Sequence, residues 1–296
     1  MNRKQTLADL ALLALAAAWG GTFVMVKDAI ALVPVFTFLV LRFSIAAIAL
    51  LGMARSHLRT LDRRALGLST LAGLLFAAGY GFQTIGLKTS GPGRVGFITG
   101  LAVVFVPIGA ALIWRHRPHR SAIVGVASAV LGLALLTGGL SGEPIASGDV
   151  WVLLGTFGFA GQILVVAVLP RQIDPRALSA VQVISTSIGC GVMTLLIEPF
   201  VWPTQLSVWG AIAFTGVIVS GVGVAVQTWA QTFTSATHTA LILATEPVFA
   251  AIFGFLLIDE RLEPAQSIGC GLILIGMLIS EFGPIRSRPQ PPALPL

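Results

Sequence analysis

Arg42 is the polar residue of this chain with the most distinctive chemistry, because it lies several residues inside a long apolar stretch. If that stretch crosses a membrane, the guanidinium group costs on the order of several kcal/mol unless it pairs or faces water. A functional arginine there supplies a fixed positive charge and several N–H donors, which suit a carboxylate or another anionic group of a ligand. A structural arginine instead donates to backbone carbonyls or extends to the membrane interface. The sequence leaves both interpretations open.

Glu246 is the other ionisable residue that we single out within an apolar stretch. Pro247 follows it and removes a backbone donor, which loosens a helix at that point. The carboxyl group could carry a coupling proton, but our preferred interpretation is a neutral or paired group that joins a kinked helix to its neighbour. His238 lies about two helical turns earlier. It either joins a proton relay or, as we prefer, begins its helix at the membrane interface.

Aromatic and amide side chains complete the candidate binding residues. Trp19 and Thr22 are three residues apart and therefore share a helix face. Together with other aromatic residues they could form a wall for a flat or apolar substrate. Glutamines add polar groups, although a single glutamine in a membrane helix more often forms an interhelical hydrogen bond. The predicted substrate-binding set is Trp19, Thr22, Arg42, Phe76, Tyr80, Gln83, Thr84, Gln162, Gln182, Gln227 and Trp229.

Composition indicates which kind of element must position these residues. The 296 residues are 56% hydrophobic and only 10% charged, and their mean hydropathy is +0.93. These polar residues are too few to cover a water-facing surface, so we predict an all-α integral membrane protein. The net charge of +6 lies in short basic clusters between apolar runs. Such clusters make no continuous basic face, which argues against a nucleic-acid partner.

Ten apolar stretches are long enough to be transmembrane helices, since a bilayer core requires about 20 apolar residues per helix. They are predicted at residues 7–26, 35–53, 65–87, 94–114, 121–139, 149–169, 177–197, 207–230, 238–257 and 264–282.

Basic residues identify the cytoplasmic side of these helices. With the amino end inside, the inner segments carry Arg3, Lys4, Arg55, Arg59, Arg63, Arg64, Arg115, Arg117, Arg120, Arg171, Arg176, Arg286 and Arg288. The outer segments carry only Lys27, Lys88, Arg94 and Arg261. We therefore expect a multi-pass protein of the plasma (inner) membrane with cytoplasmic N and C termini.

The chain contains an internal repeat. Shifting residues 80–136 forward by 144 positions places Gln83–Thr84 on Gln227–Thr228 without a gap. Five helices per copy is an odd number, so the second copy must enter the membrane inverted. We predict repeats at 1–140 and 141–285, followed by a disordered cytoplasmic tail at 286–296. Inverted repeats of this kind form a substrate pathway near the bilayer midplane and open it to each side in turn.

The two copies differ at the charged positions. Glu246–Pro247 aligns with Ala102–Val103, and Arg42 aligns at an offset of 140 with Gln182. The roles of Arg42 and Glu246 are therefore not duplicated.

Four short motifs carry a resemblance to a known family. They are Trp19-Gly20-Gly21-Thr22-Phe23, Leu41-Arg42-Phe43, Thr245-Glu246-Pro247-Val248-Phe249 and Asp259-Glu260-Arg261-Leu262. In this order, within a duplicated five-helix unit, they resemble EamA-type members of the drug/metabolite transporter superfamily. The resemblance implies a ten-helix exporter of small metabolites. Amino acids, purines and drug-like compounds are among the substrates of that family.

These observations favour a secondary transporter, with a small-molecule substrate and the lipid bilayer as partners. No P-loop is present, so we expect no ATP. Cys190 and Cys270 have no metal spacing, and we expect no metal and no cofactor. Without an HExxH or GxSxG motif we also expect no enzyme. The alternatives are a non-transporting membrane sensor or scaffold, and a lipid-moving protein.

Overall fold

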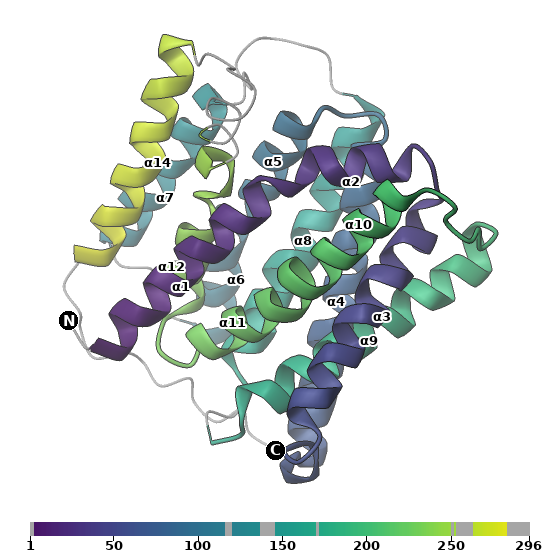
Figure 1. Ribbon diagram of the computed structural model, residues 1–296. Coiled ribbons are helices and arrows are strands. Elements are labelled where there is room, and N and C mark those ends of the chain that lie inside the picture. The colour runs from purple at the N-terminus through teal and green to yellow at the C-terminus, as the bar shows by residue number, and fades with distance from the viewer. Residues whose placement is uncertain are drawn as a thin grey trace.

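A computed structural model of the protein describes residues 3–115, 120–136, 146–169, 172–249 and 263–282, together with Ile252. The described residues form a bundle of helices and contain no β-strand (Figure 1). The first half comprises α1 (Arg3–Gly20), α2 (Thr22–Ile30), α3 (Val35–Ala54), α4 (Arg63–Leu87), α5 (Pro92–Gly100), α6 (Ala102–Trp114) and α7 (Arg120–Leu136). The second half comprises α8 (Ser147–Ala167), α9 (Pro175–Ile197), α10 (Leu206–Phe214), α11 (Gly223–Ala230), α12 (Ala236–Leu243) and α14 (Pro264–Phe282).

The prediction of an all-α membrane protein is confirmed. Within the described ranges, seven helical segments are long and apolar enough to cross a membrane, by length and composition. Two shorter apolar helices, Arg120–Leu135 and Pro264–Ile279, cover two further predicted spans. The predicted span 238–257 begins as α12 and lies partly outside the described residues, as does the predicted tail at 286–296.

Four of the predicted helices are interrupted, which the apolar pattern did not indicate. The first is broken at Gly21 and the fourth at Leu101. The eighth contains a π-helical segment, Thr215–Val222, between α10 and α11. The ninth is broken at Ala244–Thr245, where Pro247 cannot donate the backbone hydrogen bond that would continue the helix.

The inverted relation of the two copies is visible in the packing of α7 against α14. A Cβ atom built on Gly132 would lie 2.6 Å from the carbonyl oxygen of Gly269, and one on Gly276 would lie 2.5 Å from that of Gly125. Gly269 and Gly276 stand 144 residues after Gly125 and Gly132. The two contacts are thus exchanged by a local two-fold axis, and the equivalent helices run antiparallel.

A second equivalent pair, α3 and α9, repeats this arrangement. Near one end of the pair, the backbone N–H of Phe36 donates to the carboxylate of Glu198. Further along, the hydroxyl oxygens of Ser44 and Ser187 are 2.9 Å apart. Residue numbers rise along α3 while those of their partners fall along α9, so these helices are antiparallel as well. The limits 1–140 and 141–285 stay a prediction.

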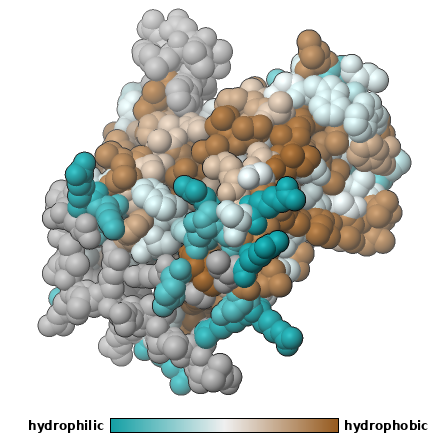
Figure 2. Space-filling model, turned by 60° about the horizontal axis from the view of Figure 1, so that its bottom comes forward, coloured by the Kyte–Doolittle hydropathy of each residue, from teal (hydrophilic) through white to brown (hydrophobic). Residues whose placement is uncertain are grey.

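One end of the bundle is basic. Figure 2 views this end, at which α3 ends and α4 and α9 begin, and shows hydrophilic side chains gathered on it. The exposed basic residues on these three elements and in the connection between α3 and α4 are Arg55, Arg59, Arg63, Arg64 and Arg176. We call this the basic end. The opposite end carries an ion pair between Arg94 and Asp149, and Asp149 also accepts a hydrogen bond from Ser90 (Oγ to Oδ1, 2.7 Å).

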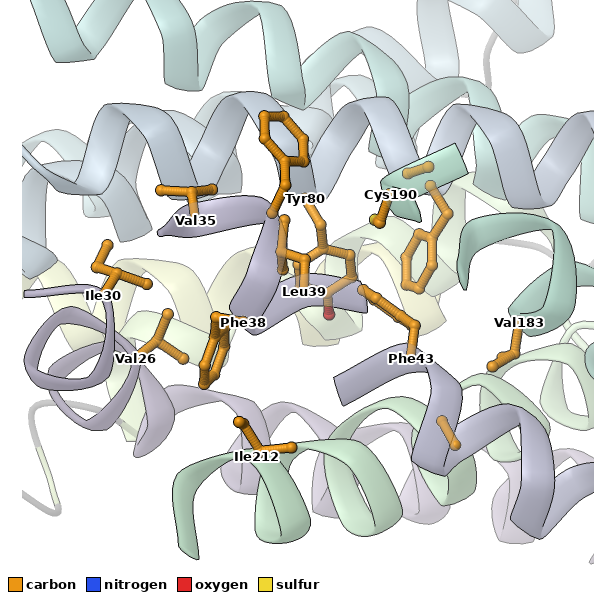
Figure 3. Close-up of a cluster of buried hydrophobic side chains, with 14 of the residues drawn as sticks. Val26, Ile30, Val35, Phe38, Leu39, Phe43, Tyr80, Val183, Cys190 and Ile212 are labelled. Atoms are coloured by element: carbon orange, nitrogen blue, oxygen red, sulfur yellow. The ribbon is translucent and has the colours of Figure 1, made fainter. Parts of the chain in front are cut away.

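The largest hydrophobic cluster joins α2, α3, α4, α9 and α10. Figure 3 shows part of it, with Phe38, Phe43, Tyr80 and Ile212 among the buried side chains. The ring centroids of Phe43 and Tyr80 are 5.2 Å apart in an edge-to-face contact, a favourable geometry for aromatic rings. This packing fixes α3 against α4 and thereby positions Arg42, which precedes Phe43.

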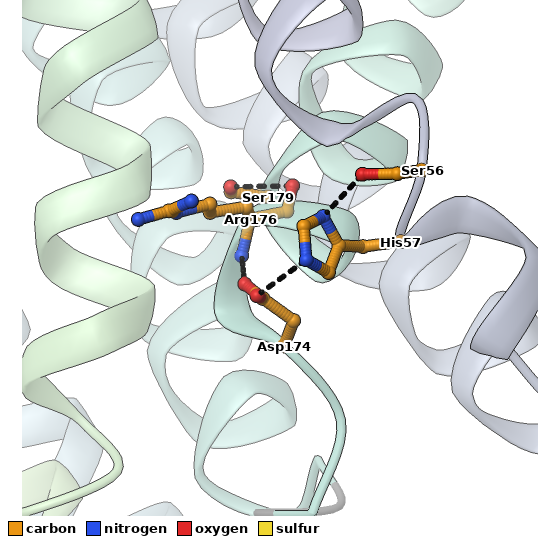
Figure 4. Close-up of polar contacts among 5 residues, drawn as sticks. All are labelled: Ser56, His57, Asp174, Arg176 and Ser179. Atoms are coloured by element: carbon orange, nitrogen blue, oxygen red, sulfur yellow. Dashed lines mark hydrogen bonds and ion pairs between the residues drawn. The ribbon is translucent and has the colours of Figure 1, made fainter.

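An exposed ion pair links the two copies at the basic end. Figure 4 shows His57, between α3 and α4, with its ring Nε2 3.4 Å from Oδ2 of Asp174. The Oδ1 atom of Asp174 accepts a hydrogen bond from the backbone N–H of Arg176 and so caps α9. Because both partners are about one-third exposed, water screens the pair and it contributes roughly 0.2–1 kcal/mol.

Candidate functional site

A cavity lies inside the bundle where the four interrupted helices meet. Its lining includes Thr22 beside the break at Gly21, Ala102 beside the break at Leu101, Val219 in the π-helical segment and Glu246 beside the ninth-helix break. Irregular backbone at membrane depth is tolerated where it is buried in protein or lines a cavity, and π-helical turns recur at functional sites. We call this space the central cavity and treat it as the candidate site.

The cavity brings together most of the residues predicted from the sequence. Those in its lining are Trp19, Thr22, Arg42, Phe76, Tyr80, Gln83, Thr84, Gln162, Gln227 and Glu246. Three predicted residues, Gln182, Trp229 and His238, do not line it. The sequence reasoning missed Phe23, Thr99 and Phe159, which do. Phe159 was detectable in principle, because it lies three residues before Gln162 and thus on the same helix face.

Arg42 is only 2% exposed and is held by side chains rather than by backbone carbonyls. Its Nε atom donates to the hydroxyl of Ser220 over 2.8 Å. Its Cζ atom lies 4.6 Å from the ring centroid of Tyr80 and 5.3 Å from that of Phe43, which are cation–π contacts. Within the described part of the chain no carboxylate pairs with it, and its Nη2 atom has no hydrogen-bond partner. The guanidinium group therefore retains donor capacity at the cavity.

The π-helical segment positions Ser220 next to Arg42. A Cβ atom on Gly216, in this segment, would lie 2.8 Å from the carbonyl oxygen of Arg42. This absence of a side chain lets the segment approach α3 closely. Trp19 also contacts the segment, since its indole Nε1 donates to the carbonyl of Val219 over 3.1 Å.

Aromatic rings form one side of the cavity. Phe76 and Tyr80 meet edge to face, with centroids 4.8 Å apart. Phe159 from α8 lies 5.7 Å from Phe76 and 5.1 Å from Tyr80. Trp229 is not part of this group, because it packs against Phe233, 5.4 Å between centroids.

Glutamines form a continuous hydrogen-bonded network. Gln227 donates to Gln162, and Gln162 donates to Gln182, each over 3.0 Å. Gln182 in turn donates to the hydroxyl of Thr228, and Gln231 donates to the carbonyl of Ile163. Gln182 thus supports one cavity residue, Gln162, from behind. Each bond between glutamines fits the interhelical role expected for amides in a membrane.

The network lies on the side of the cavity toward the basic end. Gln182 lies near the start of α9, and Gln162 and Gln227 lie near the ends of α8 and α11, all of which are at the basic end. The cavity lining extends in the other direction, to Val26 and Leu87. The cavity therefore reaches from the glutamine network toward the end opposite the basic end.

Glu246 lines the cavity and is partly exposed. Its repeat-related residue, Ala102, lines the cavity as well. The site thus holds a carboxyl group and a guanidinium group on opposite halves of the duplicated fold. His238 lies outside this lining, and its ring bonds to Asp9.

Comparisons with known proteins agree on one kind of protein. The model of the EamA-like transporter family matches residues 6–138 and again residues 146–282. An uncharacterized transporter of Archaeoglobus fulgidus is 30% identical over 282 residues, covering 93% of this chain and 86% of that protein. The uncharacterized inner membrane transporter YedA of Escherichia coli K12 is 23% identical over 297 residues, covering 97% and 94%.

A solved crystal structure shares the fold. It superimposes with a TM-score of 0.75 at 19% sequence identity and covers 93% of this chain and 98% of its own. At this identity the likeness bears on the fold alone.

Proposed function

The chain belongs to the EamA-like transporter family, and from this membership we propose that it exports a small metabolite across the inner membrane by alternating access. The observation that carries the proposal is the central cavity, because residues of both copies line it and it lies at four helix interruptions. Inverted-repeat transporters bind their substrates at such discontinuous helices. The name of the relative YedA supports the inner membrane as the location.

Sidedness follows from the basic end. We propose that this end faces the cytoplasm, with both termini on that side, because exposed arginines gather there and cytoplasmic segments of membrane proteins are rich in arginine and lysine. The glutamine network then closes the cavity toward the cytoplasm. Export requires a second state, in which this network separates.

Charge in the cavity favours one substrate class among amino acids, purines and drug-like compounds. Arg42 offers donors to a carboxylate, and Glu246 offers an acceptor to an ammonium group. The rings of Phe76, Tyr80 and Phe159 offer an apolar surface to a side chain. An amino acid carries all three features, whereas a neutral nucleobase or a cationic dye brings no negative charge to compensate that of Arg42.

A counterflow screen in liposomes tests this proposal. Purified protein is reconstituted and loaded with an unlabelled amino acid, a nucleobase or a cationic dye, and uptake of the labelled compound is followed. We expect counterflow for amino acids. A correctly folded protein that exchanges none of these compounds would contradict the proposal.

Two tryptophans provide a matched pair for the same assay. Trp19→Phe removes a hydrogen bond at the cavity, so we expect the KM of counterflow to rise by about fivefold, since an ordinary hydrogen bond contributes about 1 kcal/mol and 1.4 kcal/mol is a factor of ten. Trp229→Phe removes the same atoms outside the lining and is expected to leave KM unchanged. If the two changes altered the KM of counterflow equally, the central cavity would not be the site that binds the transported compound.

A further inference from the structure

A buried acid–base pair lies outside the central cavity. Asp9 in α1 is 7% exposed and His238 in the first turn of α12 is 8% exposed. The ring Nε2 of His238 lies 3.1 Å from Oδ1 of Asp9. The second carboxylate oxygen of Asp9 is buried and has no hydrogen-bond partner. A polar atom of this kind is costly in a membrane protein and calls for a functional explanation.

The pair joins the two halves of the duplicated fold. Asp9 belongs to the first copy and His238 to the second, and both lie near the basic end, where α1 and α12 begin. Apolar side chains pack around this contact: Ala8, Leu12, Ala230 and Ile242, with Phe233 and Met277 against them. Water is therefore largely excluded while α1 and α12 remain in contact.

Few other charged groups lie on the described elements that pack against the pair. On α1 the other charged residues are Arg3 and Lys4, and the Nζ atom of Lys4 lies 5.9 Å from the ring centroid of Phe233. The packed elements α6, α11 and the π-helical segment contain no ionisable side chain. The remaining helices packed against α1 or α12 contain a few ionisable residues. They are Lys27 and Asp28 in α2, Arg120 at the start of α7, Asp149 near the start of α8, and Cys270 and Glu281 in α14. Among the described residues, the charge of the pair is thus set mainly by its own protons.

Charge balance connects the protonation of this pair to the separation of the two helices. One proton shared between Asp9 and His238 gives a net charge of zero, either as carboxylate and imidazolium or as two neutral groups. Loss of that proton to water leaves one uncompensated negative charge among apolar side chains. An uncompensated buried charge strongly destabilises the packing around it, whereas exposure to water relieves the cost.

We propose that Asp9 and His238 form a proton-binding site that holds the cytoplasmic side of the transporter closed while the proton is bound. Release of the proton to the cytoplasm favours separation of α1 from α12 and opens the cavity on that side. This inference rests on the proposed alternating access. It assigns the proton to a site away from the cavity lining, at the contact between the copies.

Spin-label distance measurements test the proposal without a substrate. Cys190 and Cys270 are replaced by alanine, and labels are attached through Leu7→Cys on α1 and Leu278→Cys on α14, both exposed positions. The protein is held in lipid nanodiscs at about pH 5.5 to about pH 8.5, the range that brackets histidine titration. We expect a longer-distance population that grows with pH, by up to about tenfold per pH unit because one proton is released.

Variants of the pair make opposite predictions. Asp9→Asn with His238→Gln leaves no group to titrate, so the distances become independent of pH. Asp9→Asn alone leaves a histidine that is neutral at high pH, so the pH dependence reverses and the longer distance grows as pH falls. A pH-independent distribution in the labelled parent, or an unchanged pH dependence in the double variant, would overturn the proposal.

His57→Gln is the matched control, because His57 forms the exposed pair with Asp174 at the same end (Figure 4). It is expected to retain the pH dependence of the labelled parent. Loss of the pH dependence in His57→Gln would assign the effect to the exposed His57–Asp174 pair and contradict the proposal. The spin-label distances are measured without transport. If the protein transported none of the tested compounds, the proposed function would be contradicted, but the distance measurements would still test the role of Asp9 and His238.

Discussion

At the scale of single residues, the two copies differ most at Arg42 and Gln182. These positions have equivalent backbone environments, since the carbonyl of Arg42 lies against Gly216 and that of Gln182 against Gly73. Their side chains differ in the hydrogen bonds that they form. Gln182 bonds to other side chains behind the cavity, whereas Arg42 has an unpaired donor at the cavity. The duplication thus supplies the scaffold, and one guanidinium group, whose Nη2 atom has no partner among the described residues, makes the site asymmetric.

Arg42→Gln tests the proposed role of this cation. If the guanidinium group binds a substrate carboxylate, its loss removes a charge-assisted hydrogen bond of about 1.5–3 kcal/mol, and counterflow of amino acids should fall by at least about tenfold. Arg42→Lys keeps the charge and should retain part of the activity. Thermal unfolding in detergent should change little in either variant. Loss of folding in Arg42→Gln would instead assign the residue a structural role.

Glu246→Gln tests whether the cavity carboxyl group is needed for coupling. If Glu246 carries a coupling proton or competes for it with substrate, transport in liposomes should lose its dependence on a proton gradient. Glu263→Gln, at an exposed position before α14, is the control and should behave as wild type. Unchanged coupling in Glu246→Gln would exclude this residue and leave the Asp9–His238 contact as the remaining candidate.

At the scale of the elements, helix interruptions and glycine contacts determine the site. Breaks at Leu101 and at Ala244–Thr245 occupy equivalent positions in the two copies. The break at Gly21 and the π-helical segment Thr215–Val222 have no counterpart. All four reach the central cavity. Glycines elsewhere let intact helices approach one another, as at Gly73 against Gln182.

Two glycines of α4 give a matched test of close packing. A Cβ atom on Gly73 would overlap the backbone of Gln182, whereas one on Gly67 meets nothing within 4 Å. Gly73→Ala should therefore destabilise the protein by about 1–3 kcal/mol, the usual cost of overpacking. Gly67→Ala should be neutral or stabilise it by up to about 1 kcal/mol. Thermal unfolding in detergent measures both, and equal midpoints would contradict the packing of α4 on α9.

At the scale of the whole molecule, the fold consists of two antiparallel copies with a polar contact at each end. His57 and Asp174 meet at the basic end, and Arg94 and Asp149 meet at the opposite end. The central cavity lies between these contacts and extends away from the basic end. Alternating access requires the two ends to open in turn, so their contacts between elements are the places where the states must differ.

Cysteine labelling in intact cells tests the proposed sidedness. In a background without native cysteines, Ser56→Cys places a thiol at the basic end and Asp28→Cys places one at the opposite end, both at exposed positions. We expect a membrane-impermeant maleimide to label Asp28→Cys directly and Ser56→Cys only after the membrane is permeabilised. The reverse pattern would place the termini outside the cell.

The sequence by itself determined the membrane class, most of the spans and most of the polar residues that line the cavity. Polar side chains are rare in an apolar chain, and each one costs free energy unless it is bonded or faces water. Polar residues within the apolar stretches of the sequence are therefore good candidates for the residues of the site. The inverted repeat followed from the 144-residue offset and the odd number of helices, and the packing of α7 on α14 confirms the inversion.

Only the tertiary structure decided which of these residues share the cavity. It separated Trp229 and His238 from the lining and paired His238 with Asp9, a residue that the sequence reasoning overlooked. The physical reason is that lipid is as apolar as the interior of the bundle. Apolar periodicity then does not reveal which face of a helix points inward. That face is set by contacts between helices far apart in the chain, such as α1 with α12 and α4 with α8.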